Sequence, residues 1–337
     1  MTDERTNGGM SGPPGPPPGL AFAQPIVTGI LIGTAFLVIF LLALHHPAPN
    51  HVPVGVVGSA DVVRTLEAGD AIAPHALNDA GQAKEQVMSG EIDAAYVVEG
   101  TQHRLIVAGA RGPVENRTLT AFFQKLSGQA ALEVQDVVPI SPQDPNGISV
   151  FYVLFGVTLG AFLFGQTMHG FRRFLSLGRK LLALAIFSVL LGAISSAVAQ
   201  GLVGAVPGNP LGVMAVMALL AASVAAFTMG VTTLLGDIGV AVSTIIALIL
   251  GTAVSGGAGP ASFLPAGFAW MSQGMPPGAA ATALRDVVYY DAGAALGPVA
   301  VMLVWLAISL LVVVGAPAGR RRTEQVVLPA VKTAPSA

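Results

Sequence analysis

Few residues in this chain have types and spacings that could do chemistry, and no catalytic set stands out among them. The sequence has no G-x-x-x-x-G-K-[ST] loop and no H-E-x-x-H motif, so ATP binding through a P-loop and a zincin site are excluded. It also lacks cysteine, which removes thiol chemistry and disulfides. His45, His46 and His51 are clustered, but prolines keep that segment extended and no carboxylate is close. We therefore expect neither an enzyme nor a metal or cofactor site.

Basic residues gather in one short segment, H-G-F-R-R-F-L-S-L-G-R-K, between two apolar runs. The bases are Arg172, Arg173, Arg179 and Lys180. One hypothesis is that they dock a separate, acidic protein on the cytoplasmic side. The other is that they only fix topology and contact lipid headgroups, where each base contributes about 1 kcal/mol at an anionic surface.

An ionisable pair, Arg285 and Asp286, follows a proline- and glycine-rich segment that contains Pro276, Pro277 and Gly278. Charged groups near a membrane must be paired or face water. These five residues could form an outer gate or a clamp between helices. Alternatively, Arg285 lies at headgroup level and Asp286 caps a helix.

Hydroxyl and amide side chains are scattered through three of the apolar runs, and no charge lies in the middle of any run. This argues against an ion-coupled transporter, which needs carboxylates within the membrane. The polar side chains could line a path for an amphipathic molecule, or could simply let helices approach closely. They are Ser195, Ser196, Gln200, Thr228 and Thr232. Asp237, at the start of another run, is read as a helix cap, with a proton relay as the alternative.

The elements that must position these residues follow from composition. Of 337 residues, 53% are hydrophobic and 10% are charged, whereas soluble domains carry about 25% charged residues. The net charge of −2 provides no field to attract nucleic acid. We predict a polytopic α-helical membrane protein with six transmembrane helices. The apolar runs are 25–44, 148–168, 181–206, 211–235, 238–254 and 296–315.

The segment between the first two runs is different, because it holds 12 of the 18 acidic residues. Short β-branched stretches alternate there with polar helical ones, which predicts a small α/β domain with some parallel pairing. The predicted strands are 54–57, 92–98, 104–110 and 132–138, with a hairpin through 99–103, and the predicted helices are 59–68, 79–90 and 113–126.

The positive-inside bias gives a topology with both termini cytoplasmic and the α/β domain outside the cell membrane. The predicted organisation runs from a disordered Pro/Gly-rich cytoplasmic tail (1–24) through the first transmembrane helix (25–45) to the extracytoplasmic α/β domain (46–147). A five-helix transmembrane domain (148–316) and a basic cytoplasmic tail (317–337) complete it. The stretch 255–293 has apolar pieces broken by Pro and Gly, then a helix at 278–290. It predicts a re-entrant or interfacial helical hairpin at the outer leaflet.

This arrangement resembles the type 2 ABC-exporter permease superfamily, and most of all its YhgE/Pip-like branch of membrane proteins. The resemblance covers about four fifths of the chain and departs from many such permeases in its Pro/Gly tail and compact outer domain. It is carried by Ser255-Gly256-Gly257, Leu264-Pro265, Trp270, Pro276-Pro277-Gly278-Ala279, Ala283-Leu284-Arg285 and Tyr289-Tyr290, and by the A-x-x-x-V-x-x-G-x-I-D-A-A-Y-V-V pattern from Ala83 to Val98.

The resemblance implies a permease subunit that works as a homodimer or paired permease in the lipid bilayer. A separate ATPase would dock on the basic loop and drive an amphipathic or cell-envelope molecule outward. The alternative is a membrane-anchored binding or scaffold protein of the cell envelope without transport activity. We expect no nucleic-acid partner in either case.

Overall fold

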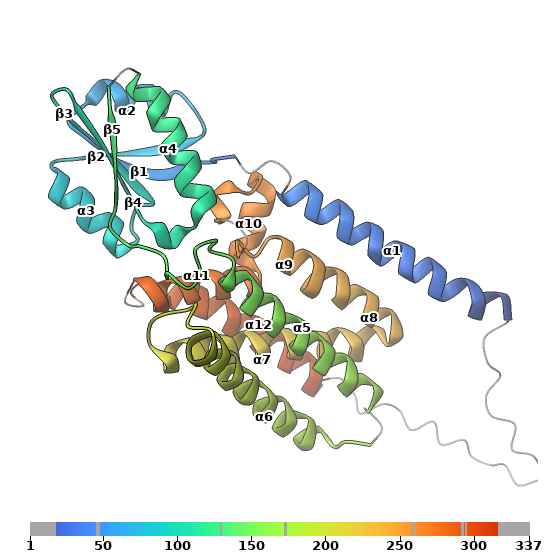
Figure 1. Ribbon diagram of the computed structural model, residues 1–337. Helices are drawn as coiled ribbons and strands as arrows, with labels where there is room; N and C mark the ends of the chain where they lie inside the picture. The colour runs from blue at the N-terminus through green and yellow to red at the C-terminus, as the bar shows by residue number, and fades with distance from the viewer. Residues whose placement is uncertain are drawn as a thin grey trace, which may run out of the picture.

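The computed structural model describes residues 18–44, 48–128, 130–171, 174–257, 260–290, 293 and 295–315. A helical bundle carries a small sheet domain at one end (Figure 1). The first residues of α1 (Pro18–Leu44) and the last residues of α12 (Leu296–Gly315) both lie at the end remote from the sheet.

The sheet domain is built on five strands in the order β2-β1-β3-β4-β5. All neighbours are parallel except β3 and β4, which form an antiparallel hairpin closed by the Glu99–Gln102 pair. The strands are β1 (Val52–Val57), β2 (Ile72–Leu77), β3 (Ala94–Glu99), β4 (Gln102–Val107) and β5 (Leu132–Asp136). The predicted strands and hairpin are confirmed, with ends shifted by a few residues. The edge strand β2 was missed, because Pro74 and His75 interrupt its apolar pattern.

Three helices cover the sheet: α2 (Ala60–Glu67), α3 (Ala80–Ser89) and α4 (Pro113–Ser127). All three were predicted, and local capping explains two of them. The Ser59 hydroxyl and the Asp79 carboxylate accept hydrogen bonds from backbone amides in the first turns of α2 and α3. Gly90 ends α3 at a φ of 77°, a left-handed conformation that favours glycine.

Each face of the sheet has its own apolar core, because successive strand residues point to opposite sides. On one face Val54, Tyr96 and Leu105 pack against Phe123 of α4. On the other face Ala95, Val97 and Ile106 pack with Ala83 and Val87 of α3. The sheet domain is therefore a three-layer α/β unit.

Among the residues that the structure describes, five helices are long and apolar enough to cross a membrane: 26–44, 149–170, 177–202, 210–235 and 296–315. The predicted fifth run corresponds to a shorter apolar helix, Asp237–Ala253, whose middle, Thr244–Leu250, is π-helical. Length and composition thus support a polytopic helical protein, with five long helices where six were predicted. Three of the long helices are α5 (Ser149–Gly170), α6 (Leu177–Ser196) with a π-helical extension (Ala197–Leu202), and α7 (Pro210–Leu235). The shorter helix consists of α8 (Asp237–Ser243), the π-helical segment and α9 (Gly251–Ala253).

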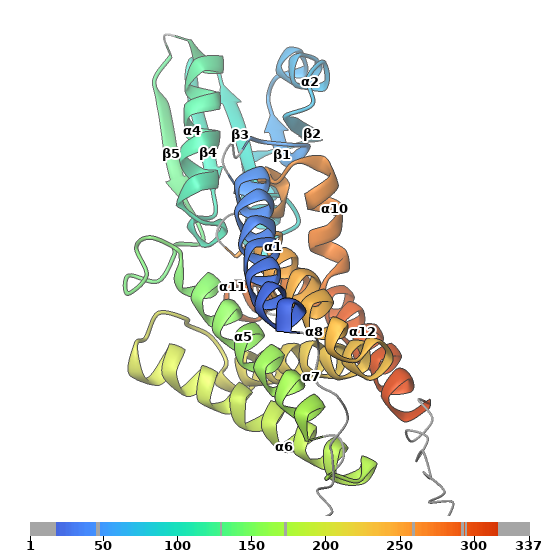
Figure 2. The same ribbon diagram turned by 90° about the vertical axis from the view of Figure 1, so that its right-hand side faces the viewer.

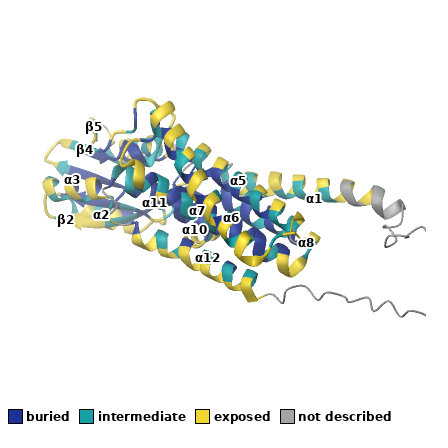
Figure 3. Ribbon diagram, turned by 90° about the horizontal axis from the view of Figure 1, so that it is seen from below, coloured by how far each residue is buried: buried dark blue, intermediate teal, exposed yellow. Residues whose placement is uncertain are grey.

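Helix α7 is the centre of the bundle and contacts α5, α6 and α12. In an 18-residue apolar stretch of α7, 56% of the residues are buried, whereas only 6% are buried in the corresponding stretch of α1. Small residues allow the close approach: a Cβ on Gly165 would meet Thr228, and one on Gly192 would meet the Met214 carbonyl. Exposed side chains lie along the outer sides of α1, α6 and α12 (Figure 3).

The 255–293 stretch contains two helices, α10 (Ala266–Gly274) and α11 (Pro276–Tyr289), separated only by Met275. The predicted helix 278–290 is confirmed but starts two residues earlier, with Pro276 and Pro277 in its first turn. Both helices lie at the sheet end of the bundle (Figure 2).

Two sequence predictions were wrong. Residues 18–24 belong to α1, so the predicted tail does not extend to residue 24; residues 1–17 lie outside the described part. Asp237 does not cap its helix through its side chain. Gly236 occupies the cap position, and the Asp237 carboxylate lies 3.1 Å from Nε2 of His169.

Candidate functional site

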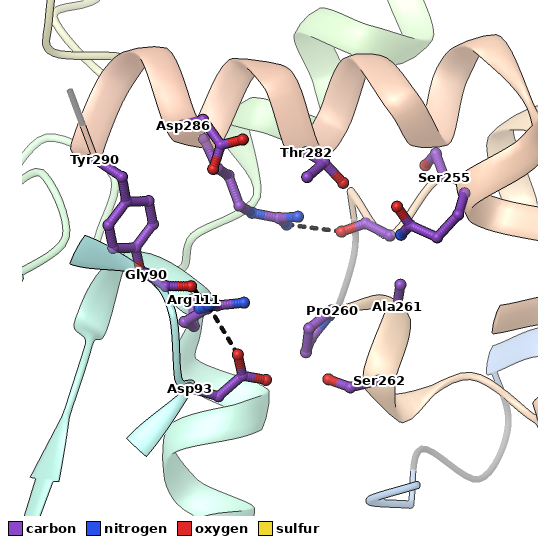
Figure 4. Close-up of a pocket in the computed structure, with 13 residues that line it drawn as sticks. Gly90, Asp93, Arg111, Ser255, Pro260, Ala261, Ser262, Thr282, Asp286 and Tyr290 are labelled. Carbon is purple, nitrogen blue, oxygen red and sulfur yellow. Dashed lines mark hydrogen bonds and ion pairs between the residues drawn. The ribbon is translucent and has the colours of Figure 1, made fainter. Parts of the chain in front are cut away.

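The sheet domain and the bundle meet around a polar cavity of about 280 Å³. Its walls come from three places: the sheet domain (Gly90, Asp93, Arg111), the loop before α10 (Ser255, Gly256, Pro260, Ala261, Ser262), and α10 and α11 (Gln273, Thr282, Arg285, Asp286, Tyr290). Figure 4 shows these side chains converging from both sides. This volume is near the lower end of the range for ligand pockets, about 300–1,000 Å³.

Two aromatic side chains hold the walls together. Phe263 enters the sheet core formed with α2 and α4, and Tyr290 enters the opposite core formed with α3. The backbone adds one link, because the Asn50 amide donates to the Ser262 carbonyl at 2.9 Å. The sheet domain is therefore anchored on both faces by the 255–293 stretch.

An ion pair between Arg111 and Asp93 forms the sheet-domain side of the cavity. Their nearest atoms, Nη2 and Oδ1, are 2.8 Å apart, and the Asp93 side chain is only 5% exposed. The same Arg111 nitrogen donates to the Gly90 carbonyl at 3.0 Å, and the guanidinium lies 5.6 Å from the centroid of the Tyr290 ring. This last contact has cation–π geometry and crosses between the two parts of the protein. Burial raises the pKa of the Asp93 carboxyl, against the lowering effect of Arg111.

Glu115, in the first turn of α4, is fully buried behind this pair. Both of its carboxyl oxygens are buried, and the carboxyl group that it faces is that of Asp93. Burial, with the added charge of Asp93, raises the pKa of the Glu115 carboxyl to about 8. A carboxylate at a helix N-terminus is ordinarily favoured, but the loss of hydration outweighs that effect here. Glu115 is therefore mostly protonated at neutral pH.

Arg285 approaches the cavity from α11. Its Nη2 donates to the Gly256 carbonyl at 2.6 Å. No described carboxylate lies within 4.0 Å of its guanidinium nitrogens. Oδ2 of the neighbouring Asp286 is buried without a partner in the described residues, whereas the Tyr290 side chain faces Arg111. The bundle side of the cavity thus presents a cation without a carboxylate partner and an unsatisfied carboxyl oxygen.

The structure brings together part of the predicted outer gate. Arg285 and Asp286 line the cavity, whereas Pro276, Pro277 and Gly278 begin the same helix and are absent from its walls. A Cβ on Gly251 would lie 3.0 Å from Pro277, and a Cβ on Gly278 would overlap the Ser272 carbonyl. The first turn of α11 therefore serves close packing.

The predicted docking bases lie far from the cavity. Arg179 and Lys180 are in the first turn of α6, at the end of the bundle remote from the sheet (Figure 1). Arg172 and Arg173 fall outside the described residues. The two described bases share that end with the His169–Asp237 contact.

The predicted path-lining residues also lie away from the cavity walls. The hydroxyls of Ser195, Thr228 and Thr232 donate to carbonyls one turn earlier in their own helices. Ser196 bonds to Gln200 at 2.8 Å, and Gln200 donates to the Gly208 carbonyl at 3.2 Å. In this conformation the three hydroxyls are hydrogen-bonded to carbonyls of their own helices, and Ser196 and Gln200 stabilise the turn between α6 and α7.

Asp93, Arg111 and Glu115 were not predicted as site residues. In sequence they resemble ordinary surface charges of a small α/β domain, whereas in the fold Asp93 and Glu115 are buried and Arg285 of α11 lies near Glu115. The one signal was the aspartate directly before an apolar strand, Ile92-Asp93-Ala94-Ala95. Compared with protein-family models and with curated proteins, the sequence matches none.

Proposed function

We propose that the chain is the membrane permease subunit of an ABC-type exporter. It works as a dimer with a separate ATPase and moves an amphipathic or cell-envelope-related molecule outward. The sheet domain lies outside the cell membrane and both termini lie in the cytoplasm. This orientation agrees with the position of Arg179 and Lys180 at the bundle end remote from the sheet. Asp237–Ala253 is the sixth crossing, short but spanning about 25 Å at 1.5 Å per residue.

The observation that carries this proposal is the double contact of α11. One side, with Ala279, Ala280, Ala283 and Leu284, lies in the main core of the bundle. Tyr290, directly after its last turn, lies in the core of the sheet domain. A shift of α11 against α7 must therefore move the sheet domain. A connection of this kind is what an exporter needs to link cytoplasmic ATP hydrolysis to an outer domain.

The π-helical segment Thr244–Leu250 adds support, because π-helical turns occur frequently at functional sites. It is followed by Gly251, which packs against Pro277 at the start of α11. A change in the winding of this short helix would be passed directly to α11.

Affinity purification from native membranes in mild detergent, with mass spectrometry of the proteins that co-elute, tests the proposal. We expect a stoichiometric ATPase that is lost when Arg172, Arg173, Arg179 and Lys180 are changed to Gln. A matched control changes four exposed bases of the sheet domain, Arg64, Lys84, Arg117 and Lys125, and should retain the ATPase. Recovery of envelope proteins held through the sheet domain, with no ATPase, would instead favour the scaffold.

A further inference from the structure

We propose that the cavity between the sheet domain and α11 binds a small singly charged oxyanion, a carboxylate or phosphodiester group, through Arg285. The cavity would then be the outer site for an anionic substrate. That role rests on the proposed function, whereas the binding itself does not.

The first argument is the unpaired charge. Two cations line the cavity, and only Arg111 has a carboxylate partner within 4.0 Å among the described residues. Arg285 is enclosed by protein yet keeps some accessible surface where it lines the cavity. An enclosed charge without a partner is costly. A guanidinium has five N–H donors, and the one described acceptor for them is the Gly256 carbonyl. The remaining donors are free to hold an anion in fork geometry.

The second argument is the charge of the groups around the cavity, which disfavours a ligand with more than one negative charge. Asp93 is compensated by Arg111, and Glu115 is mostly neutral at pH 7. Asp286 lies next to Arg285 on α11, and its Oδ2 atom is buried. This carboxylate opposes a second negative charge on the ligand. A phosphomonoester, which carries about −1.5 to −2 at neutral pH, is therefore a poorer fit than a carboxylate or a phosphodiester.

The third argument is the lining. Ser262 and Thr282 reach the cavity from the loop before α10 and from α11 (Figure 4). The exposed Gln273 stands at its edge. Hydroxyl and amide groups are suited to the uncharged polar part of a small ligand. The volume of about 280 Å³ fits a headgroup or a small metabolite.

The test uses the purified full chain in neutral detergent, with chloride held low and constant. Sodium lactate and dimethyl phosphate are titrated by isothermal calorimetry and by their effect on thermal unfolding. We expect both to bind and stabilise the protein, and Arg285→Gln to weaken binding at least tenfold, because one charge-assisted contact is lost. Arg117→Gln is the control, since this exposed arginine of α4 does not line the cavity.

Thr282→Val provides a second variant that leaves Arg285 in place, and it should weaken binding by a smaller factor. A parallel arm compares nanodiscs of phosphatidylglycerol and of phosphatidylcholine. Stabilisation by phosphatidylglycerol that is lost in Arg285→Gln identifies a lipid headgroup as the ligand. Binding of the soluble anions without this lipid effect identifies a free molecule. Either outcome supports the site.

Failure of every anion to bind, or equal binding by wild type and Arg285→Gln, would overturn the inference and leave the cavity to water. No ATPase is present in these measurements. A negative result therefore bears on the anion site and leaves the exporter proposal to its own co-purification test.

Discussion

Glu115→Gln is the substitution that most directly probes the buried charges at this junction. Glutamine keeps the size of the side chain and removes the titrating proton. The groups that face Glu115 are Asp93, Arg111, Arg285 and Tyr290. All of them stay in place in the variant, so the change in pH dependence reports the Glu115 proton together with its effect on the neighbouring Asp93 carboxyl.

The expected magnitude follows from proton linkage. The Glu115 pKa is about 8 in the folded protein and 4.5 in its ordinary state. Between these values the folded state binds more protons than the unfolded state, so stability falls as pH rises. The stabilising effect of the protonated carboxyl is complete below about pH 4.5 and is lost through pH 8. One proton corresponds to about 1.4 kcal/mol per pH unit. As the pH rises from 4.5 to 8, the free energy of unfolding of Glu115→Gln should therefore increase relative to that of wild type by up to about 1.4 kcal/mol per pH unit.

Two assays on the full chain in detergent check this expectation. Denaturant titrations between pH 5.5 and 8.5 give the difference in free energy of unfolding between the variant and wild type. Infrared difference spectroscopy follows the C=O stretch of a protonated carboxylic acid. We expect one band that disappears with a midpoint near pH 8 and is absent in Glu115→Gln. A carboxyl band at position 115 that titrates near pH 4.5, with parallel stability curves, would refute the reasoning.

Three further predictions concern packing and pairing. Asp93→Asn should lower the free energy of unfolding by roughly 3 kcal/mol, because it leaves Arg111 buried without its carboxylate; denaturant titration against wild type measures it, and a loss below 1 kcal/mol would contradict the pair. Gly192→Ala should reduce the yield of folded protein in size-exclusion chromatography, since a Cβ would lie 2.6 Å from a backbone carbonyl of α7, whereas Gly178→Ala, with open space around it, should not. Phe123→Ala should cost about 3–5 kcal/mol, because its fully buried ring fills the sheet core; a near-neutral value in denaturant titration would show that this core is misplaced.

Much of the fold could be predicted because its signals are local. The capped helices of the sheet domain are marked by Ser59, Asp79 and Gly90, and the long apolar runs mark the bundle. The edge strand β2 was missed because strand patterns assume alternation, and Pro74 and His75 break it where pairing on one side suffices. The start of α1 was misplaced because Pro18 is acceptable in a first helical turn, although it stands in a proline-rich tail.

The site was only half predictable, and the reason is physical. Arg285 and Asp286 stood out because charges are rare in apolar sequence. Asp93, Arg111 and Glu115 did not, because a charge in a polar domain is ordinary until another element buries it. Arg285 and Tyr290, which lie near Glu115 and Arg111 in the fold, come about 170 residues or more later in the chain. Sequence spacing carries no record of such a contact.

The outward orientation of the sheet domain and its cavity is the claim on which the exporter proposal and the outer-site role of the cavity both depend. Because the chain has no cysteine, single cysteines can report it directly. We would introduce Glu85→Cys on α3 and Ser176→Cys before α6, both at exposed positions, and treat intact cells with a membrane-impermeant maleimide. We predict labelling of the residue 85 cysteine in intact cells and of the residue 176 cysteine only after permeabilisation. The reverse pattern would place the cavity in the cytoplasm and contradict the account.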